Sequence, residues 1–456
     1  MSYYIVQLSK YGIAVLAILY TLECFLVCGK KDEETSYGNF SRQNFYMFGI
    51  QFLGYLTMFL KTKKIEYLFF FAFLQIALSL TRILYQSIYP YCNTLLINNM
   101  RMLLSTGLMM LTRLNYEKAI KQFFIVVVTM AGTLMIPFLI HKMRFLRHLK
   151  WLYGILGIVA LGAVLILGQV THGSKISYTI AGITLQPSEF VKIIFAFFIA
   201  AMLYEAVNLR EIGISAIFAG IHVLILVLSK DLGSSIIFFM GYLFMILIAS
   251  GNYLYLLAGG VGGGLAAIIG YFLFSHVRVR VQAFLDPFTL IDNQGYQISQ
   301  SLFAIGSGKW FGMGLYQGTP SDIPFVEADF IFSAIAEELG GIYAICLILI
   351  CLTCFFTFLK IGTLLQDTFY RLLACGLGVM YIFQVFLTVG GGMKFIPLTG
   401  VTLPLVSYGG SSVLTTLIMF AIMQGLYMIH FVEKIEADKV EAQILLRSGV
   451  NPYKNR

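Results

Sequence analysis

Charged residues are scarce in this sequence, because Asp, Glu, Lys and Arg make up only 12% of its 456 residues. A water-soluble protein carries charge on roughly a quarter of its residues. Apolar residues reach 59% instead, and the mean hydropathy is +0.84. Lipid tolerates such a surface, since membrane-spanning helices satisfy their own backbone hydrogen bonds. The scarcity of charge therefore argues against a soluble protein and predicts a polytopic α-helical membrane protein.

Several motifs of soluble and energy-coupled proteins are also missing. There is no Walker loop and no Gly-x-Gly-x-x-Gly after a strand, so ATP-driven transport lacks support. None of the six His residues has a partner at metal-ligand spacing, and the sequence predicts no metal cage. The seven Cys residues lie mainly in apolar runs and predict no disulfide framework. No small-residue cleavage site follows the first apolar run, which we interpret as a retained span.

The net charge of +9 does not indicate a nucleic-acid partner. The basic residues are scattered between apolar runs, and no basic patch with interleaved aromatic residues occurs. Such a distribution favours contact with the anionic headgroups of a lipid bilayer.

Thirteen apolar runs between residues 11 and 429 approach the roughly twenty residues that a helix needs to cross a bilayer. The basic stretch 141–150 should be cytoplasmic, because short loops rich in Lys and Arg stay inside. Alternation from this stretch places the long loop 276–328 and the N-terminus outside, and the tail 431–456 inside. Long loops of this kind are usually functional or disordered, and its glycines and aromatic residues favour an ordered one.

Four polar groups cap or interrupt the spans on the predicted outer side, where ionisable residues are costly and therefore candidates for function. In the first group, Pro187 begins a helix, and Glu189 and Lys192 follow at positions that can pair on one helix face. This pair either supports a functional cavity or merely neutralises a helix end. In the last group, 404–412, Gly409 and Gly410 permit a turn or close helix approach, with or without a function.

The other two groups lie in and after the long loop. Arg278 and Arg280 precede a polar run at 286–301, and such arginines bind a phosphate or anchor lipid headgroups. Asp329 stands where the loop meets a long apolar run. Its carboxylate is either a helix N-cap or a general base at the mouth of a cavity.

Taken together, these strings resemble the RodA/FtsW/SpoVE family, the SEDS proteins of shape, elongation, division and sporulation. The resemblance extends over roughly residues 95–430, with the motifs in the family's order and spacing. The matching stretches are 186–192, 230–233, 295–308, 329–332, 337–340 and 403–412.

The family fold has ten spans, so the resemblance implies an all-α polytopic membrane protein with a ten-span SEDS-like core. We expect this core at 93–430, after about three additional spans at 1–92 and before a cytoplasmic tail at 431–456. The resemblance also implies a peptidoglycan glycosyltransferase that polymerises lipid II at the outer face of the bacterial cytoplasmic membrane. A class B penicillin-binding protein is the expected partner.

The resemblance assigns roles to individual residues as well. Asp329 matches the family's essential acid and is the expected catalytic base. Glu189 and Lys192 match its cavity pair, and Lys121 matches a cationic position where Arg is usual. Further cations could stabilise the leaving pyrophosphate, with or without a divalent ion; these are Arg278, Arg280 and Lys394. One departure is that Glu327 and Ala328 stand where the family usually has His and Thr or Ser.

Two other functions fit parts of the same pattern. A flippase for a lipid-linked cell-wall precursor would also need membrane spans and an intramembrane pair such as Glu189 and Lys192. A flippase built for alternating access, however, is expected to bind near the membrane midplane between repeats, whereas these motifs gather at one face. A non-catalytic scaffold for a penicillin-binding protein would explain the changes at Glu327 and Ala328, but retention of Asp329 argues against it.

Overall fold

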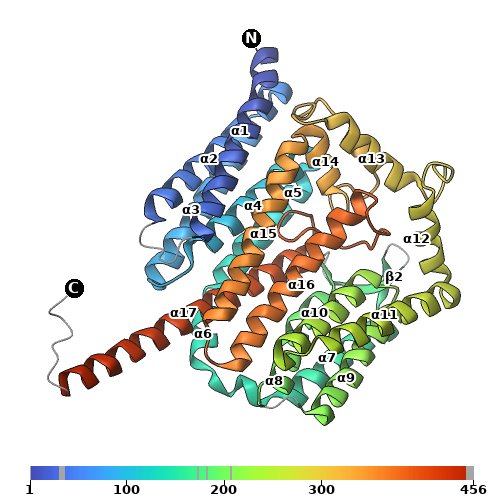
Figure 1. Ribbon diagram of the computed structural model, residues 1–456. Helices are drawn as coiled ribbons and strands as arrows, with labels where there is room; N and C mark the ends of the chain where they lie inside the picture. Colours follow the sequence, from blue (N-terminus) through green and yellow to red (C-terminus); the bar gives the residue numbers. More distant parts are fainter. Residues whose placement is uncertain (1, 30–35, 172–173, 181–182, 206–207, 448–456) are drawn as a thin grey trace.

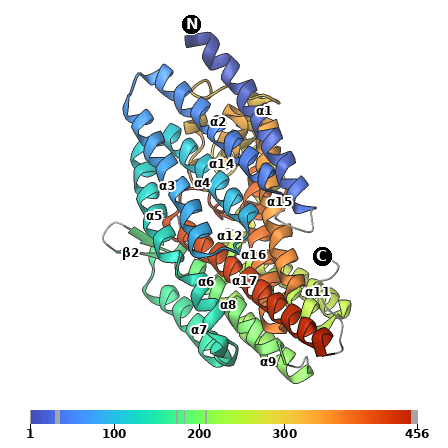
Figure 2. The ribbon, with the colours of Figure 1, turned by 90° about the vertical axis from the view of Figure 1, so that its left-hand side faces the viewer.

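The computed structural model describes residues 2–29, 36–171, 174–180, 183–205 and 208–447 and is largely helical. Figures 1 and 2 show long helices packed side by side. Their bounds are α1 (Ser2–Cys28), α2 (Tyr37–Thr62), α3 (Glu66–Ile88), α4 (Thr94–Leu114), α5 (Tyr116–Thr133), α6 (Ile136–Lys142), η2 (Arg144–His148), α7 (Lys150–Leu167), α8 (Pro187–Leu203), α9 (Leu209–Leu228), α10 (Leu232–Ser250), α11 (Tyr253–Leu273), α12 (Ser275–Leu285), α13 (Tyr296–Gly308), η3 (Pro320–Asp322), α14 (Ile331–Glu338), α15 (Gly341–Leu364), α16 (Thr368–Gly392) and α17 (Gly410–Arg447).

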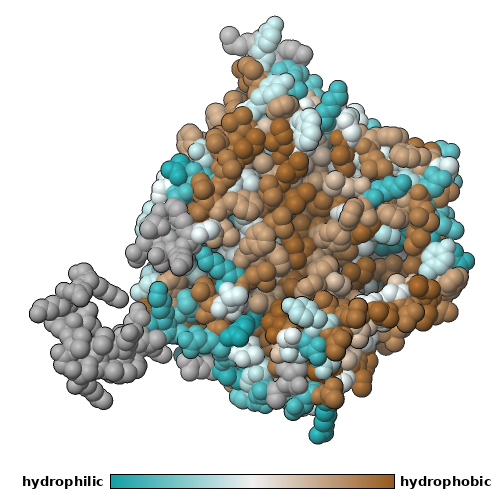
Figure 3. Space-filling view, viewed as in Figure 1, coloured by the Kyte–Doolittle hydropathy of each residue, from teal (hydrophilic) through white to brown (hydrophobic). Residues whose placement is uncertain are grey.

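Within these described ranges, ten helical segments are long and apolar enough to cross a membrane, and the longest joins α5 to α6. Figure 3 shows apolar side chains over most of the face formed by α15, α16 and their neighbours, with hydrophilic residues gathered toward the lower edge. A band of apolar surface of this kind is suited to lipid, and the prediction of a multi-pass membrane protein is confirmed.

Three of the thirteen predicted runs, α2, α4 and α8, fall outside that group of ten. The helix α8 has only 17 residues. The helix α4 carries Asn98, Asn99 and Arg101, all of them buried. These polar groups find partners inside the protein, where hydrogen bonding offsets much of the cost of burial.

The segment between α11 and α15 gathers at one end of the bundle, which we call the loop end (Figure 1). It contains α12, α13, η3 and α14, and is therefore ordered as expected. The N-terminal part of α1 reaches the same end, because the Lys10 ammonium donates to the Gly312 carbonyl at 3.2 Å. The C-terminal end of α17 lies at the opposite end (Figure 1). Of the tail expected at 431–456, residues 431–447 continue α17 and residues 448–456 lie outside the described part of the chain.

Two local features differ from the sequence-based expectation. The chain between α7 and α8 forms a small antiparallel sheet of β1 (Gln169–Thr171), β2 (Ser174–Ile180) and β3 (Ile183–Leu185), in the order β1-β2-β3. The apolar run expected at 329–359 is two helices, α14 and α15, which are separated at Gly340. Gly340 has φ +93°, and a Cβ there would lie 2.3 Å from the Gly312 backbone nitrogen. Only glycine fits this turn readily, so the helix breaks here.

Candidate functional site

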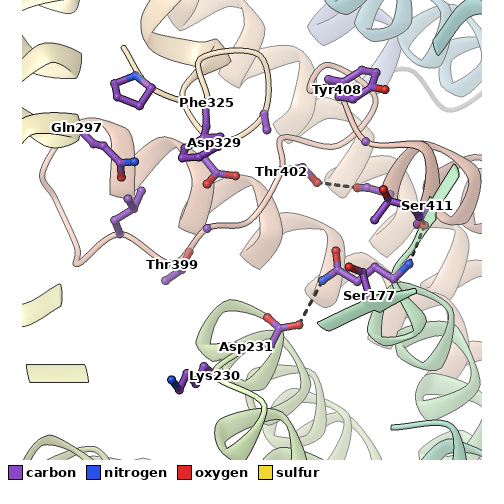
Figure 4. Close-up of a pocket in the computed structure, with 18 of the residues that line it drawn as sticks. Ser177, Lys230, Asp231, Gln297, Phe325, Asp329, Thr399, Thr402, Tyr408 and Ser411 are labelled. Carbon is purple, nitrogen blue, oxygen red and sulfur yellow. Dashed lines mark hydrogen bonds between the residues drawn. The ribbon is translucent and has the colours of Figure 1, made fainter. Parts of the chain in front are cut away.

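A cavity of about 1100 Å³ lies at the loop end, and residues from distant parts of the sequence line it. It is large enough for a sizeable ligand, since most small-molecule sites enclose roughly 300–1,000 Å³. Figure 4 shows Asp329 and Asp231 on opposite sides of this space. The charged and amide side chains among its lining residues are Lys121, Gln186, Lys230, Asp231, Arg280, Asn293, Gln294, Gln297 and Asp329.

Asp329 occupies the last turn of loop before α14. Phe330, and not Asp329, takes the N-cap position of this helix, with φ −114° and ψ 17°. A Cβ placed on Gly400 would lie 3.7 Å from Oδ2 of Asp329, so the carboxylate lies against a position that has no side chain. The Asp329 backbone nitrogen donates to the Phe325 carbonyl at 3.2 Å, which fixes the turn.

The segment before Asp329 is held by the polar residues that precede α17. The Ser407 hydroxyl donates to the Ala328 carbonyl at 2.5 Å, and the Tyr408 backbone nitrogen donates to the Glu327 carbonyl at 2.7 Å. The side chain of Gln122 in turn holds this second segment, since its amide donates to the Ser407 carbonyl at 2.8 Å. These polar residues therefore position the backbone that carries the candidate base.

Glu327, which departs from the usual family residue, has a structural partner. Its carboxylate forms an ion pair with Lys118 of α5, and the Lys118 ammonium also lies 5.5 Å from the centre of the Tyr408 ring. Lys121, one helical turn further along α5, is exposed and lines the cavity. The first ammonium therefore supports the loop, and the second is available to a ligand.

Asp231 is a lining acid that sequence analysis did not single out as a site residue. It is the N-cap of α10 and accepts hydrogen bonds from the Ser234 backbone nitrogen at 3.1 Å and the Ser188 hydroxyl at 3.0 Å. The Gln186 side-chain amide donates at 3.3 Å to Oδ2, the same oxygen that accepts from Ser188. Burial raises the pKa of Asp231, although these hydrogen bonds work in the opposite direction. In the sequence, Asp231 could have been recognised as an acid directly before an apolar run, within the stretch 230–233 that matches the family.

Arg280 and Arg278 have different environments although both lie in α12. Residues two apart on a helix point about 200° apart around its axis. The Arg280 guanidinium lines the cavity and donates to the carbonyls of Leu398 at 3.1 Å and Thr399 at 3.0 Å. Burial lowers its pKa, whereas the charges of two nearby carboxylates raise it. Arg278 is exposed and donates to the Phe272 carbonyl at 3.0 Å, away from the cavity lining.

Lys394 is another predicted cation outside the lining of the cavity. Its ammonium lies 3.5 Å from the Leu285 carbonyl. The cations that do line the cavity are Lys121, Lys230 and Arg280.

Glu189 and Lys192 form the predicted pair, with 2.8 Å between the Lys192 ammonium and the Glu189 carboxylate. Both side chains are buried, at 9% and 3% exposure. The Lys192 ammonium also donates to the Gln384 amide oxygen at 2.6 Å. The amide nitrogen of Gln384 donates to the Thr402 carbonyl at 3.1 Å and the Ser412 hydroxyl at 3.3 Å, and both of these residues line the cavity. The pair therefore lies behind the cavity wall and supports it.

The arrangement suits acid–base chemistry on an anionic ligand. Asp329 can accept a proton, and the three lining cations can hold negative charge beside it. In the described part of the chain, no three His, Cys, Asp or Glu side chains are grouped as metal ligands would be.

Residues 86–430 match the family model of the FtsW/RodA/SpoVE cell cycle proteins. The peptidoglycan glycosyltransferase RodA of Mycobacterium tuberculosis is 32% identical over 363 residues, covering 73% of this chain and 77% of that protein. The probable peptidoglycan glycosyltransferase FtsW of Tolumonas auensis is 34% identical over 285 residues, covering 60% of this chain and 73% of that protein.

Solved structures resemble the fold over the same region. A structure described as a peptidoglycan synthase complex that coordinates polymerization and crosslinking has a TM-score of 0.63 and 23% identity, covering 74% of this chain and 97% of that chain. The rod shape determining protein RodA of Thermus thermophilus has a TM-score of 0.54 and 21% identity, covering 74% of this chain and 96% of that chain. The extent of the family match, supported by these relatives, shows that the chain belongs to the FtsW/RodA/SpoVE family of cell cycle proteins.

Proposed function

We propose that this protein is a peptidoglycan glycosyltransferase that polymerises lipid II into glycan strands, with Asp329 as the general base. The observation that carries the proposal is the placement of Asp329 in a large cavity together with Lys121, Lys230 and Arg280. An acid beside several cations fits a reaction that removes a proton and releases a pyrophosphate. The mycobacterial and Tolumonas relatives, which are named as peptidoglycan glycosyltransferases, support the same activity.

The reaction exchanges one C–O bond for another. The 4-hydroxyl oxygen of the acceptor sugar attacks the anomeric carbon of the donor, and its proton passes to the Asp329 carboxylate. The bond from the anomeric carbon to the pyrophosphate oxygen breaks, and undecaprenyl pyrophosphate leaves with the electron pair. Lys121, Lys230 and Arg280 stabilise the negative charge that develops on the leaving group.

The buried pair beside the cavity has a supporting role in this proposal. Glu189 and Lys192 neutralise each other and hold Gln384, which in turn bonds to two residues of the wall. Arg278 and Lys394 lie off the lining, so we assign them no contact with the reacting atoms.

The site belongs at the outer face of the bacterial cytoplasmic membrane. The basic stretch 141–150 favours the cytoplasm, and span alternation from it places the loop end outside. We assign residues 93–430 to the catalytic core, residues 1–92 to additional spans and residues 431–456 to a cytoplasmic tail.

A penicillin-binding protein of class B is the proposed partner. Glycan strands must be crosslinked after they are polymerised, and the cavity described above accounts only for polymerisation. One similar structure is a peptidoglycan synthase complex that coordinates polymerization and crosslinking, which supports such a partner.

A flippase is less compatible with the position of the cavity. Most of its lining residues lie near helix ends or in the segments between helices, such as Asp231 and Asp329. Transport by alternating access is expected to use a site near the middle of the membrane.

The test is polymerisation of purified lipid II by the purified full-length protein and by the Asp329→Asn variant. Asn keeps the size of the side chain and an oxygen that accepts hydrogen bonds, but it is not a base that can take up the proton. The rate of glycan synthesis should fall by roughly 10²-fold or more. Asp292→Asn, which changes an exposed acid elsewhere in the same long loop, is the matched control and should retain the wild-type rate.

Near-normal synthesis by Asp329→Asn would remove Asp329 as the base. Absence of synthesis by the wild-type protein, both alone and with a class B penicillin-binding protein, would contradict the glycosyltransferase proposal itself.

A further inference from the structure

The helices α1, α2 and α3 lie mostly before the region that matches the family model, which begins at residue 86. They form a group on one side of the bundle, against α4 and α15 (Figures 1 and 2). Two of these helices also reach the loop end and touch the segment 309–319, which lies between α13 and η3. We call this segment the frame segment.

The helix α1 contacts the frame segment through neighbouring residues. The Lys10 ammonium donates to the Gly312 carbonyl at 3.2 Å. The rings of Tyr11 and Phe311 lie 5.1 Å apart. Gly312 has φ +76°, and a Cβ there would lie 2.3 Å from the Glu338 carbonyl oxygen. The backbone that α1 touches is therefore closely packed against the end of α14.

The helix α3 contacts the frame segment at a second point. The hydroxyl groups of Tyr67 and Tyr316 lie 3.3 Å apart and share a hydrogen bond. Tyr316 has φ +62°, a conformation that is uncommon for a residue with a side chain. Its position is therefore maintained by neighbours, among them the Arg113 guanidinium, which lies 4.1 Å from the centre of its ring.

The frame segment is in turn bonded along α14, the helix that follows Asp329. The backbone nitrogens of Met313 and Gly314 donate to the carbonyls of Glu337 and Glu338 at 2.8 and 2.9 Å. Backbone nitrogens of the frame segment also bind the two carboxylates, from Thr319 to Glu337 at 2.9 Å and from Tyr316 to Glu338 at 3.1 Å. The helix has eight residues, about 12 Å at 1.5 Å per residue, and begins two residues after Asp329.

The helices α1 and α2 are themselves fixed to the core by buried polar contacts. Asn99 of α4 accepts from the Tyr20 hydroxyl at 3.1 Å and donates to the Thr353 hydroxyl of α15 at 2.9 Å. The Asn98 amide donates to Gln43 of α2 at 2.8 Å. In an apolar setting these bonds favour one alignment of the helices, because a shift would leave buried polar groups without partners.

We propose that α1–α3 act as an internal brace, which holds the frame segment and, through α14, keeps Asp329 in its working position. Lys10 and Tyr67 are positioning residues in this inference, since they act through the frame segment and not on the substrate. The inference rests on the proposed function of Asp329. It gives the additional N-terminal helices a role in the reaction, although they lie away from the cavity lining.

The test uses the full-length protein with a Lys10→Met and Tyr67→Phe double variant. Both changes keep the apolar part of the side chain and remove the polar contact with the frame segment. One measurement is hydrogen exchange of the backbone amides in 309–319 and α14. The other is the kcat and KM of lipid II polymerisation. Deletion of α1–α3 is unsuitable, because it would expose Asn99 and Arg101 to lipid.

Loss of two hydrogen bonds should accelerate amide exchange in the frame segment by roughly 10-fold. The value of kcat should fall by a similar factor or more, since small displacements of a catalytic group are costly, while KM changes little. Lys10→Arg keeps a donor, so when it replaces Lys10→Met in the double variant it should recover part of both readouts, because only the Tyr67 bond is then missing. The control is Lys64→Met, which removes an exposed cation beside Glu66 and should leave both readouts unchanged.

Unchanged exchange, unchanged kcat or an equal effect of Lys64→Met would each overturn the brace. Failure of the proposed function is separately visible, because the exchange measurement does not depend on activity. A wild-type protein without polymerase activity would remove the proposed function, while exchange would still report whether α1–α3 hold the frame segment.

Discussion

The ammonium of Lys192 lies 2.6 Å from the amide oxygen of Gln384 and 2.8 Å from the carboxylate of Glu189. Through this amide, a buried charge pair in α8 is joined to the wall of the cavity. Loss of either charged partner would leave the other uncompensated in a poorly solvated place, at a cost of about 3–5 kcal/mol.

The charge pair should therefore behave as a unit. Glu189→Ala and Lys192→Ala should each lower thermal stability and lipid II polymerisation strongly, whereas the double variant should be milder than the sum of the two. Thermal unfolding in detergent and initial polymerisation rates of all four proteins provide the measurement. Strict additivity in both would show that the two charges do not interact.

The two arginines of α12 should differ sharply when each is replaced by Gln. Arg280→Gln removes a cavity cation and two charged hydrogen bonds to the segment beside Gly400, so we expect kcat/KM for lipid II to fall roughly 10- to 100-fold. Arg278→Gln changes an exposed residue and should stay close to wild type. Initial rates at varied lipid II test this, and equal losses in both variants would contradict the assignment of Arg280 to the site.

Stability should depend on pH through Glu338. Burial raises the pKa of Glu338 to about 7, against the opposing effects of Arg113 and the Tyr316 backbone nitrogen. The unfolded chain has a value of about 4.3, so the folded protein binds this proton more tightly. The contribution of this group to stability is therefore full below pH 4.3 and is lost as the pH rises to about 7, which amounts to about 3–4 kcal/mol.

The Glu338→Gln variant isolates this contribution. Its thermal stability in detergent should decline less than that of the wild-type protein between pH 4.5 and pH 8, and the remaining decline comes from other buried acids such as Glu337 and Asp231. Asp292→Asn, an exposed acid, should keep the wild-type slope. Identical slopes in wild-type protein and Glu338→Gln would show that folding leaves the pKa of Glu338 near its ordinary value.

The orientation of the chain can be tested by cysteine labelling from outside the cell. An Asp292→Cys variant should react with a membrane-impermeant maleimide, whereas Lys434→Cys should not, because both positions are exposed and lie at opposite ends of the bundle. The native cysteines give little background, since six of them are buried and Cys28 is partly buried. The reverse pattern would place the cavity at the cytoplasmic face and exclude synthesis outside.

Much of this protein could be predicted from local sequence. Apolar runs of about twenty residues specify spans because backbone groups in lipid must bond within their own helix. The spacing of Glu189 and Lys192 places them one helical turn apart whatever surrounds them, and the structure has them in contact. Asp329 could be selected because an acid at the start of an apolar run is rare and its surrounding string resembles a family motif.

Other features depended on contacts between residues far apart in the sequence. Arg278 and Arg280 cannot be distinguished in the sequence. The packing of α12 places Arg280 in the cavity lining and Arg278 outside it. Asp231 became a site residue because α8 and α10 bring Ser188 and Gln186 to it. No local pattern contains such information, because burial and charge neighbours are properties of the packed chain.

The N-terminal helices show most clearly what could be predicted from the sequence and what depended on the tertiary structure. Hydropathy alone predicts that residues 1–92 cross the membrane. The contacts of Lys10 with Gly312 and of Tyr67 with Tyr316 join positions 302 and 249 residues apart. No local pattern brings residues at such separations together, so tertiary structure alone decided that α1 and α3 reach the segment framing α14 and Asp329.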